Sequence, residues 1–262
     1  MTRVVGINRA GSIWVTPQDV ALMAEHNLWY RVDFRREFDD PARNLAYKLL
    51  GDAKVRCLPI LIWNDKRPQT EDQWWAWKDY VQQMVSRYPR FNNWQLWNEP
   101  NNARVPNSFF ENVDAWRAFL RRTARYIKNV KPDVNLVAGG IAVGGHGSKR
   151  IREFWEPWFR VSNIIDRVAI HTYCSDASEA AKAVNNTKRV AEQPVWVTEL
   201  GCKSTVDGEK QQASWYRGVR DKTGNIPLFW YDLQDVPGSF EGFGALRLDG
   251  TRKPVWRSIV AT

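Results

Sequence analysis

The sequence has few of the residues that build disulfide scaffolds and metal sites. It contains three cysteines and three histidines in 262 residues. Three cysteines are too few for a disulfide framework, and their spacing matches no metal-binding motif. The histidines are His26, His146 and His171, so the His-x-His pairs of metal-dependent hydrolases are absent. We therefore expect neither a metal nor a disulfide scaffold. For Cys174 and Cys202, which each follow a predicted strand end, one disulfide and two buried free thiols both stay open as interpretations.

Long apolar runs are also absent. No stretch is long enough to cross a bilayer. Residues 1–6 enter a strand pattern directly, without the apolar segment of a signal peptide. We therefore expect a soluble monomer that does not insert into a membrane. A cytoplasmic protein, a phage-borne protein and a secreted protein whose leader has been removed all agree with this pattern.

Basic residues outnumber acidic ones. Lysine and arginine total 38 against 29 aspartates and glutamates, which gives a net charge of +9 and a pI near 9.6. An excess of this size favours an acidic partner such as an anionic polysaccharide, a nucleic acid or a cell envelope, although a basic solvated surface would look the same. The basic residues are scattered in pairs such as Arg35-Arg36 and Arg121-Arg122, and no nucleic-acid motif accompanies them. We expect no specific nucleic-acid partner.

A short apolar run followed by an amphipathic helix repeats along the whole chain. Capping signals mark several helix starts, for example Thr16-Pro17 and the capping box that begins at Thr70. The fourth long helix is expected from Ser108 to Asn129. The predicted strands are 3–8, 28–33, 55–63, 94–99, 135–140, 167–173, 195–200 and 227–233. Eight strands alternating with helices predict an α/β fold, a (β/α)8 TIM barrel that forms a single domain over residues 1–262.

Two of the predicted strands end in a glutamate. Residues 94–100, Trp-Gln-Leu-Trp-Asn-Glu-Pro, form an apolar strand that ends at Asn98, Glu99 and a proline. Residues 195–201, Val-Trp-Val-Thr-Glu-Leu-Gly, repeat the pattern, with the lone Glu199 toward the far end. A carboxylate at a buried strand end is a candidate for catalysis, while a solvated glutamate at a loop start is the alternative.

Polar side chains collect at most of the other strand ends as well. In a TIM barrel these ends meet at one face, so we expect a shared active site there. No strand contains a lysine, which excludes a Schiff-base mechanism, and we expect no cofactor. Two carboxylates among tryptophans are typical of glycoside hydrolysis. The candidate residues are Arg31, Asp33, Trp63, Asn98, Glu99, His171, Tyr173, Glu199 and Trp230, with Trp14 as a further sugar contact.

These positions resemble the signature of clan A glycoside hydrolases, the retaining (β/α)8 enzymes of the 4/7 type. The resemblance rests on Trp97-Asn98-Glu99-Pro100, Thr198-Glu199 and His171-Thr172-Tyr173, together with Arg31 and Trp230. The closing segment, Phe243-Gly244-Ala245-Leu246 through Lys253-Pro254, is similar to family 39 members, and family 5 is the other group that the chain resembles.

The resemblance implies a role for each matched residue. Glu99 would be the acid/base and Glu199 the nucleophile. Asn98 would bind the sugar 2-hydroxyl, while Arg31 and Tyr173 would keep Glu199 ionised. His171 would orient groups in the site, and Trp230 would form the floor beneath the sugar. Trp14, Trp63 and Asp33 would make further sugar contacts.

Three hypotheses for function follow. The first is a retaining, endo-acting β-glycosidase on a polysaccharide, because short loops leave an open groove and the basic charge suits an anionic glycan. The second is an exo-β-glycosidase on oligosaccharides. The third is a barrel that binds carbohydrate with little turnover. The partner in each case is a polysaccharide or oligosaccharide.

Overall fold

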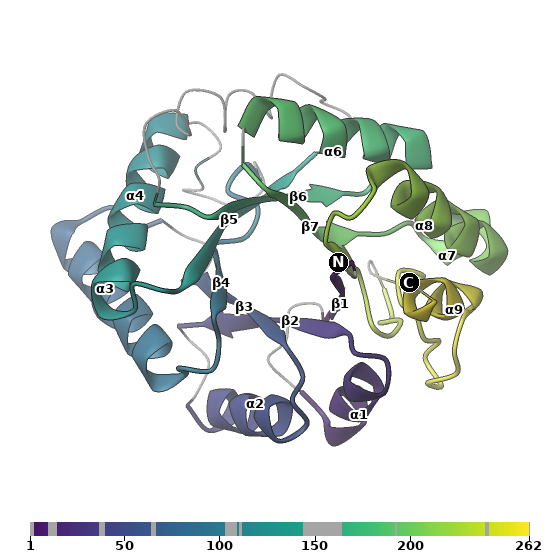
Figure 1. The fold of residues 1–262 in the computed structure, drawn as a ribbon, viewed down its shortest axis with the longest axis horizontal. Helices are drawn as coiled ribbons and strands as arrows, with labels where there is room; N and C mark the ends of the chain where they lie inside the picture. The colour runs from purple at the N-terminus through teal and green to yellow at the C-terminus, as the bar shows by residue number, and fades with distance from the viewer. Residues whose placement is uncertain are drawn as a thin grey trace.

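The chain forms a closed barrel of eight parallel strands with helices on the outside (Figure 1). The structure is a computed structural model that describes residues 3–9, 15–36, 40–63, 67–102, 109, 112–143, 164–191, 193–238 and 241–261. The strands are β1 (Val5–Asn8), β2 (Trp29–Arg35), β3 (Cys57–Ile62), β4 (Asn93–Leu96), β5 (Asn135–Ala142), β6 (Arg167–Thr172), β7 (Val195–Leu200) and β8 (Leu228–Trp230). Strand β1 pairs with both β2 and β8, which closes the barrel and confirms the predicted fold class.

The described helices are α1 (Pro17–Glu25), α2 (Asp40–Asp52), α3 (Glu71–Arg87), α4 (Val113–Val130), α6 (Ala177–Ala191), α7 (Ser204–Asp207), α8 (Glu209–Thr223) and α9 (Pro254–Val260). Three of them, α1, α3 and α4, begin at a residue whose side chain caps the helix. Thr16 and Thr70 each close a capping box, in which the threonine side chain accepts from the third helical backbone N–H. One predicted boundary was too early, because the fourth helix begins at Val113, where Asn112 caps the N–H of Ala115.

Some of the sequence-based predictions concern segments other than these strands and helices. After the fifth strand the sequence has a glycine-rich segment, residues 144–147, which favours a loop, and apolar residues at helical spacing that predict a helix around 151–158. Both segments lie outside the described residues. The three cysteines are free thiols, so Cys174 and Cys202 do not form a disulfide. Among the helices that the structure describes, none has the length and apolar character needed to cross a lipid bilayer.

Two apolar layers support the barrel. The larger one lies between strands and helices and includes an aromatic cluster around Trp77, Trp97 and Phe119, whose rings lie 5.2 to 5.9 Å apart. The smaller one fills the barrel interior toward the amino ends of the strands. Its members are Trp29, Leu58, Val137, Ala169, Trp196 and Phe229. This plug closes the interior at that end, so the next layer of inward side chains faces the open end.

Strand alternation decides which side chains form that next layer. Residues two positions apart on a strand point to the same face. Arg31 follows Trp29, His171 follows Ala169, and Tyr231 follows Phe229 at this interval. The interior therefore changes from apolar to polar within one step along the strands. The polar layer lies at the carboxyl ends of the strands, where TIM-barrel active sites form.

Candidate active site

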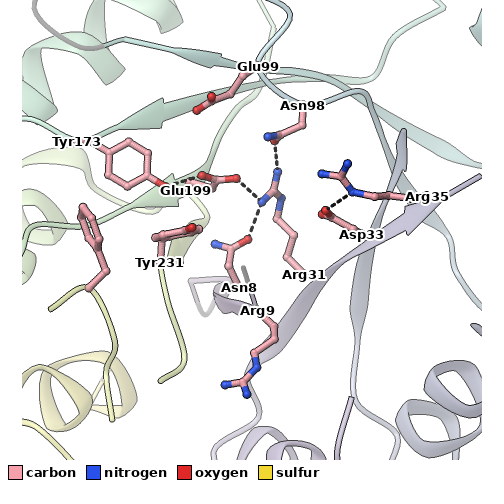
Figure 2. Close-up of a pocket in the computed structure, with 11 residues that line it drawn as sticks. Asn8, Arg9, Arg31, Asp33, Arg35, Asn98, Glu99, Tyr173, Glu199 and Tyr231 are labelled. Carbon is pink, nitrogen blue, oxygen red and sulfur yellow. Dashed lines mark hydrogen bonds and ion pairs between the residues drawn. The ribbon is translucent and has the colours of Figure 1, made fainter. Parts of the chain in front are cut away.

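A cavity of about 390 Å³ opens at the carboxyl ends of the strands (Figure 2). It brings together six of the ten residues predicted from the sequence, because the strand ends converge at this face. The lining residues are Asn8, Arg9, Arg31, Asp33, Arg35, Asn98, Glu99, Tyr173, Glu199, Tyr231 and Phe243. In Figure 2 the carboxylates of Glu99 and Glu199 approach the same space from different strands.

Glu99 reaches the cavity through an unusual backbone at the end of β4. Trp97 has a φ of 72° and Glu99 a φ of 42°. Both values lie in the left-handed region of backbone conformation, which residues other than glycine rarely adopt. The turn buries Trp97 in the aromatic cluster around Trp77 and Phe119 and leaves the Glu99 side chain 23% exposed. Strain of this kind persists only where the surrounding structure holds it, and it concentrates at functional sites.

Glu199 is held from two sides and is almost completely buried. Nη1 of Arg31 lies 2.7 Å from Oε1 of Glu199, and the Tyr173 hydroxyl donates to Oε2. Burial by itself raises the pKa of Glu199. The charges of His171 and Arg31 and the Tyr173 hydrogen bond act against it, and the net effect is a lowered pKa. Glu199 is therefore a carboxylate kept in its ionised form.

Tyr173 remains a hydrogen-bond donor. Burial is the main cause that raises the pKa of Tyr173 well above the ordinary tyrosine value, and the negative charge of Glu199 is the second cause. The hydroxyl therefore keeps its proton, and Glu199 keeps an uncharged donor on the side opposite Arg31.

His171 lies between the two carboxylates. Its Nδ1 is 3.0 Å from Oε1 of Glu99 and 3.4 Å from Oε2 of Glu199, and the ring is fully buried. The closest of these atoms all lie within 4.8 Å of one another. Carboxyl groups about 5 to 5.5 Å apart belong to retaining glycosidases, whereas inverting enzymes need about 6.5 to 9.5 Å. The spacing of Glu99 and Glu199 fits the retaining arrangement.

The same three side chains have donor atoms close enough for a metal ion. One imidazole and two carboxylates form a ligand set of the kind that divalent metals accept. However, the guanidinium of Arg31 already neutralises Glu199 at 2.7 Å, and a cation bound to the same carboxylate would face that positive charge. The electrostatics therefore favour an acid and base pair over a resident metal.

Arg31 connects four strands beneath the cavity. Besides Glu199, it donates to Oδ1 of Asn8 at 2.7 Å, to Oε1 of Gln95 at 2.9 Å and to Oδ1 of Asn98 at 2.8 Å. These partners come from β1, β4 and the residues just after β4. Because the oxygen of Asn98 accepts from Arg31, its amide nitrogen is the group left to donate to a ligand.

Asp33 and Arg35 form a second charged pair at the edge of the cavity. Nε of Arg35 lies 3.1 Å from Oδ2 of Asp33. Burial raises the pKa of Asp33, and the nearby charges of Arg35 and Arg31 only partly offset this effect. Figure 2 shows this pair beside Arg31, while the guanidinium of Arg9 points away from Glu199.

The predicted tryptophan contacts are not part of this cavity. Trp230 is fully buried, donates to the carbonyl of Phe243 at 3.0 Å and packs against Trp215 and Tyr216 of α8. This placement contradicts the prediction that Trp230 forms the floor. The reason is strand alternation, because Phe229 faces the barrel interior and Trp230 therefore faces the helices.

The two other tryptophans also lie elsewhere or are not described. Trp63 stacks on Trp77 with an interplanar angle of 6°, and the guanidinium of Arg36 lies 4.4 Å from its ring centre. Trp63 does not line the cavity. Trp14 lies outside the described residues. The aromatic wall is made instead by Tyr173, Tyr231 and Phe243, whose ring centres are 5.6 to 5.7 Å apart.

Sequence reasoning missed several members of the site. Asn8 ends a predicted strand, so the rule that selected Arg31 and Glu199 also applied to it. Gln95 was visible as a buried amide within an apolar strand. Side-chain alternation could have selected Tyr231 in place of Trp230, because Tyr231 shares a face of the strand with Phe229, two positions earlier. Phe243 lies beyond β8 in a connection whose path only the tertiary structure shows.

The sequence also matches a protein-family model. Residues 52–218, more than half of the chain, match the model described as glycosyl hydrolase catalytic core. Among curated protein sequences, no significant match to the chain is found.

Several solved structures share the fold at low sequence identity. An exo-β-1,4-mannosidase from Opitutaceae bacterium strain TAV5 has a TM-score of 0.76 at 15% identity over 99% of this chain. A family 39 β-xylosidase from Caulobacter crescentus has a TM-score of 0.72 at 17% identity over 99% of this chain and 70% of its own. An endo-laminarinase from Formosa Hel1_33_131 has a TM-score of 0.67 at 15% identity, over 98% of this chain and 86% of its own. The chain spans 58% of the length of the mannosidase.

Proposed function

Because the chain belongs to the glycosyl hydrolase catalytic core family, we propose that it hydrolyses a β-glycosidic bond with retention of configuration. Family membership agrees with the clan A resemblance seen in the sequence. The observation that carries the proposal is the pair of carboxylates at the ends of β4 and β7, within 4.8 Å of one another in one cavity. A retaining glycosidase requires such a pair, with one carboxyl group as the acid/base and the other as the nucleophile.

In the first step Glu199 attacks the anomeric carbon. Its lowered pKa keeps it ionised, and the donors Arg31 and Tyr173 hold its two oxygens in place. Glu99 donates its proton to the glycosidic oxygen, the bond from the anomeric carbon to that oxygen breaks, and the leaving sugar departs. The product is a covalent glycosyl ester of Glu199.

In the second step Glu99 acts as a base. Its carboxylate takes a proton from a water molecule, the water oxygen bonds to the anomeric carbon, and Glu199 is released as a carboxylate. His171 contacts both carboxylates through Nδ1, so it holds them in a fixed relation through both steps. The first step leaves Glu99 deprotonated, as the second step requires, and the second step returns the proton to Glu99 and frees the Glu199 carboxylate for the next cycle.

The remaining lining residues fit roles in sugar binding. The Asn98 amide nitrogen is a donor for the sugar 2-hydroxyl, a contact that strengthens in the oxocarbenium-like transition state. Tyr231 and Phe243 offer ring faces or edges for the apolar side of a sugar. Asp33 and Arg35 form a charged edge for hydroxyl or carboxylate groups.

We propose endo action on a polysaccharide. Support comes from the connections after β6 and β7, residues 173–176 and 201–203, which are short and leave room for a polymer on that side of the cavity. The net charge of +9 favours a glycan that carries acidic groups. Exo action is the second candidate, because the similar mannosidase is an exo-acting enzyme.

The test is a proton NMR time course on a panel of neutral and anionic β-glycans. We expect the first product to carry the β anomeric signal and to be a mixture of oligosaccharides. Monosaccharide as the only early product would establish exo action, and an α anomer would overturn the retaining mechanism. Binding of a glycan without cleavage would favour a carbohydrate-binding barrel. The Glu199→Gln variant serves as the control for contaminating activity.

A further inference from the structure

A second cavity lies on the outside of the barrel, between α8 and α9. Its volume is about 650 Å³, and its lining contains no acidic residue. Six of its lining residues are cations, namely Arg217, Arg220, Arg247, Arg252, Lys253 and Arg257. We call this feature the arginine groove. Figure 1 shows α8 and α9 side by side at the right of the barrel, and the groove shares no lining residue with the catalytic cavity.

Four of these cations have acidic partners. Arg247 forms two hydrogen bonds to Glu209, at 2.7 and 2.8 Å. Lys253 pairs with Asp235 at 2.6 Å. Arg220 and Arg252 form more exposed pairs with Asp221 and Glu25, at 3.0 and 3.6 Å. Exposed pairs of this kind contribute only about 0 to 1 kcal/mol, so they give way easily to a stronger anion.

The two other arginines have no acidic partner among the described residues. Arg217 donates to the hydroxyl of Ser258 at 3.0 Å, which orients its guanidinium without neutralising it. Arg257 is exposed and makes no side-chain hydrogen bond or ion pair within the part of the chain that the structure describes. Because one arginine lies on α8 and the other on α9, an anion between the helices would meet both.

A further cation borders the same region. Nη2 of Arg3 donates to the carbonyl of Arg220 at 2.7 Å. Burial lowers the pKa of Arg3, and the charge of Arg220 adds to that effect. Like charges gathered in this way repel one another, and a bound anion removes the repulsion. The spread of cations along the groove suits a ligand with several acidic groups better than one small ion.

We propose that the arginine groove is a secondary binding site for an acidic polysaccharide. The guanidinium fork matches the two oxygens of a carboxylate or sulfate group. The lining contains no aromatic side chain, so it lacks the stacking surface on which single-stranded nucleic acids depend. The choice of a glycan over other polyanions rests on the proposed function, because a glycosidase with a second substrate site gains a longer residence on its polymer.

The test compares two double variants that remove the same charge. Arg217→Gln with Arg257→Gln alters the groove, while Arg121→Gln with Arg125→Gln alters two exposed arginines on α4, on the other side of the barrel (Figure 1). The probe is an α-linked oligogalacturonate, which a β-glycosidase does not cleave. Isothermal titration calorimetry measures its affinity, with a neutral malto-oligosaccharide and a single-stranded oligothymidylate for comparison.

We expect the groove variant to bind oligogalacturonate about tenfold more weakly than wild type, which corresponds to about 1.4 kcal/mol. The α4 variant should bind within about twofold of wild type. Equal losses in both variants would overturn the proposal in favour of diffuse charge attraction, and no loss in either would also overturn it. A loss of oligothymidylate affinity alone would assign the groove to nucleic acid instead.

Hydrolysis measurements separate this proposal from the proposed function. Both double variants should cleave a short aryl β-glycoside at the wild-type rate, because neither pair of arginines lines the catalytic cavity. If wild type cleaves no glycan but the groove-specific loss is seen, the proposed function fails and the anion site stands. If cleavage is seen and the two variants bind alike, only the groove proposal fails.

Discussion

Oε1 of Glu199 lies 2.7 Å from Nη1 of Arg31, and their side chains are only 10% and 3% exposed. An ion pair in this setting holds the carboxylate ionised in a place where burial alone would protonate it. The same guanidinium donates to Asn8, Gln95 and Asn98. The ionisation of Glu199 and the positions of its neighbours therefore depend on one side chain.

Replacing Arg31 by methionine should change the pH dependence of catalysis. Without the positive charge the ionised form of Glu199 is less favoured, so its pKa rises. Activity is lost as the pH falls through that pKa, and the acidic limb of kcat/KM should move to higher pH. Arg31→Lys keeps the charge and should move the limb less. An acidic limb in the methionine variant that coincides with wild type would remove Arg31 from this role.

Arg31→Met should also destabilise the fold. Removal of one partner of a buried ion pair costs about 3 to 5 kcal/mol, because the other charge is left without compensation. Urea denaturation followed by tryptophan fluorescence measures the change. The loss should be smaller at acidic pH, where the orphaned Glu199 becomes protonated. A loss that does not vary with pH would mean that packing, and not charge, accounts for the effect.

Glu199→Gln should abolish turnover while the fold survives. Glutamine keeps the shape of the side chain and can accept from Arg31, but it cannot form the glycosyl ester. We expect kcat to fall by roughly four orders of magnitude or more, with circular dichroism unchanged. Wild-type-like activity in freshly purified variant would exclude Glu199 as the nucleophile.

Glu99→Ala should show a loss that depends on the leaving group. Protonation matters for sugar leaving groups, where the rate should fall by about 10² to 10⁴. Activated aryl glycosides leave without a proton, so the formation of their glycosyl ester should be affected far less. Single-turnover kinetics on both substrate types provide the measurement. Equal losses would contradict the assignment of Glu99 as the acid.

Gly140→Ala tests the packing behind His171. Gly140 has a φ of +93°, and an added Cβ would lie 2.6 Å from Nε2 of His171. Gly238 is the matched control, because its φ is +94° and its Cβ would meet nothing within 4 Å. Both variants should lose about 1 to 3 kcal/mol from backbone strain. Only Gly140→Ala should also lower kcat, because His171 must move. Equal kcat values in the two variants would show that the position of His171 is not critical.

Much of the fold was readable from the sequence because its signals are local. Apolar runs of strand length, capping residues and the spacing of helix faces each depend on a few neighbouring residues. They predicted eight strands alternating with helices, and the barrel followed from that count. Glu99 and Glu199 were found for the same reason, since each is a lone carboxylate at the end of an apolar strand.

The orientation of side chains at the strand ends depends on more than local sequence. On β7, the interior residue Trp196 would by strict alternation be followed by Thr198, yet Glu199 faces the cavity. The register of β7 shifts against β8 between Val197 and Leu200, and the shift turns Glu199 inward. A one-residue change of register reverses the face of every later side chain. Pairing with the neighbouring strand therefore decides this position.

The sequence by itself determined the barrel and marked Glu99 and Glu199 as candidate site residues. Both depend on the order of apolar and polar residues along short continuous segments, and burial of the apolar residues fixes those segments as strands and helices. The tertiary structure alone decided that Trp230 packs against α8 while Tyr231 lines the cavity. It also brought Asn8, Gln95 and Asn98 onto the guanidinium of Arg31, and it gathered arginines from two helices and a loop into the arginine groove. These arrangements depend on strand register and helix packing, which join residues that are distant in the chain.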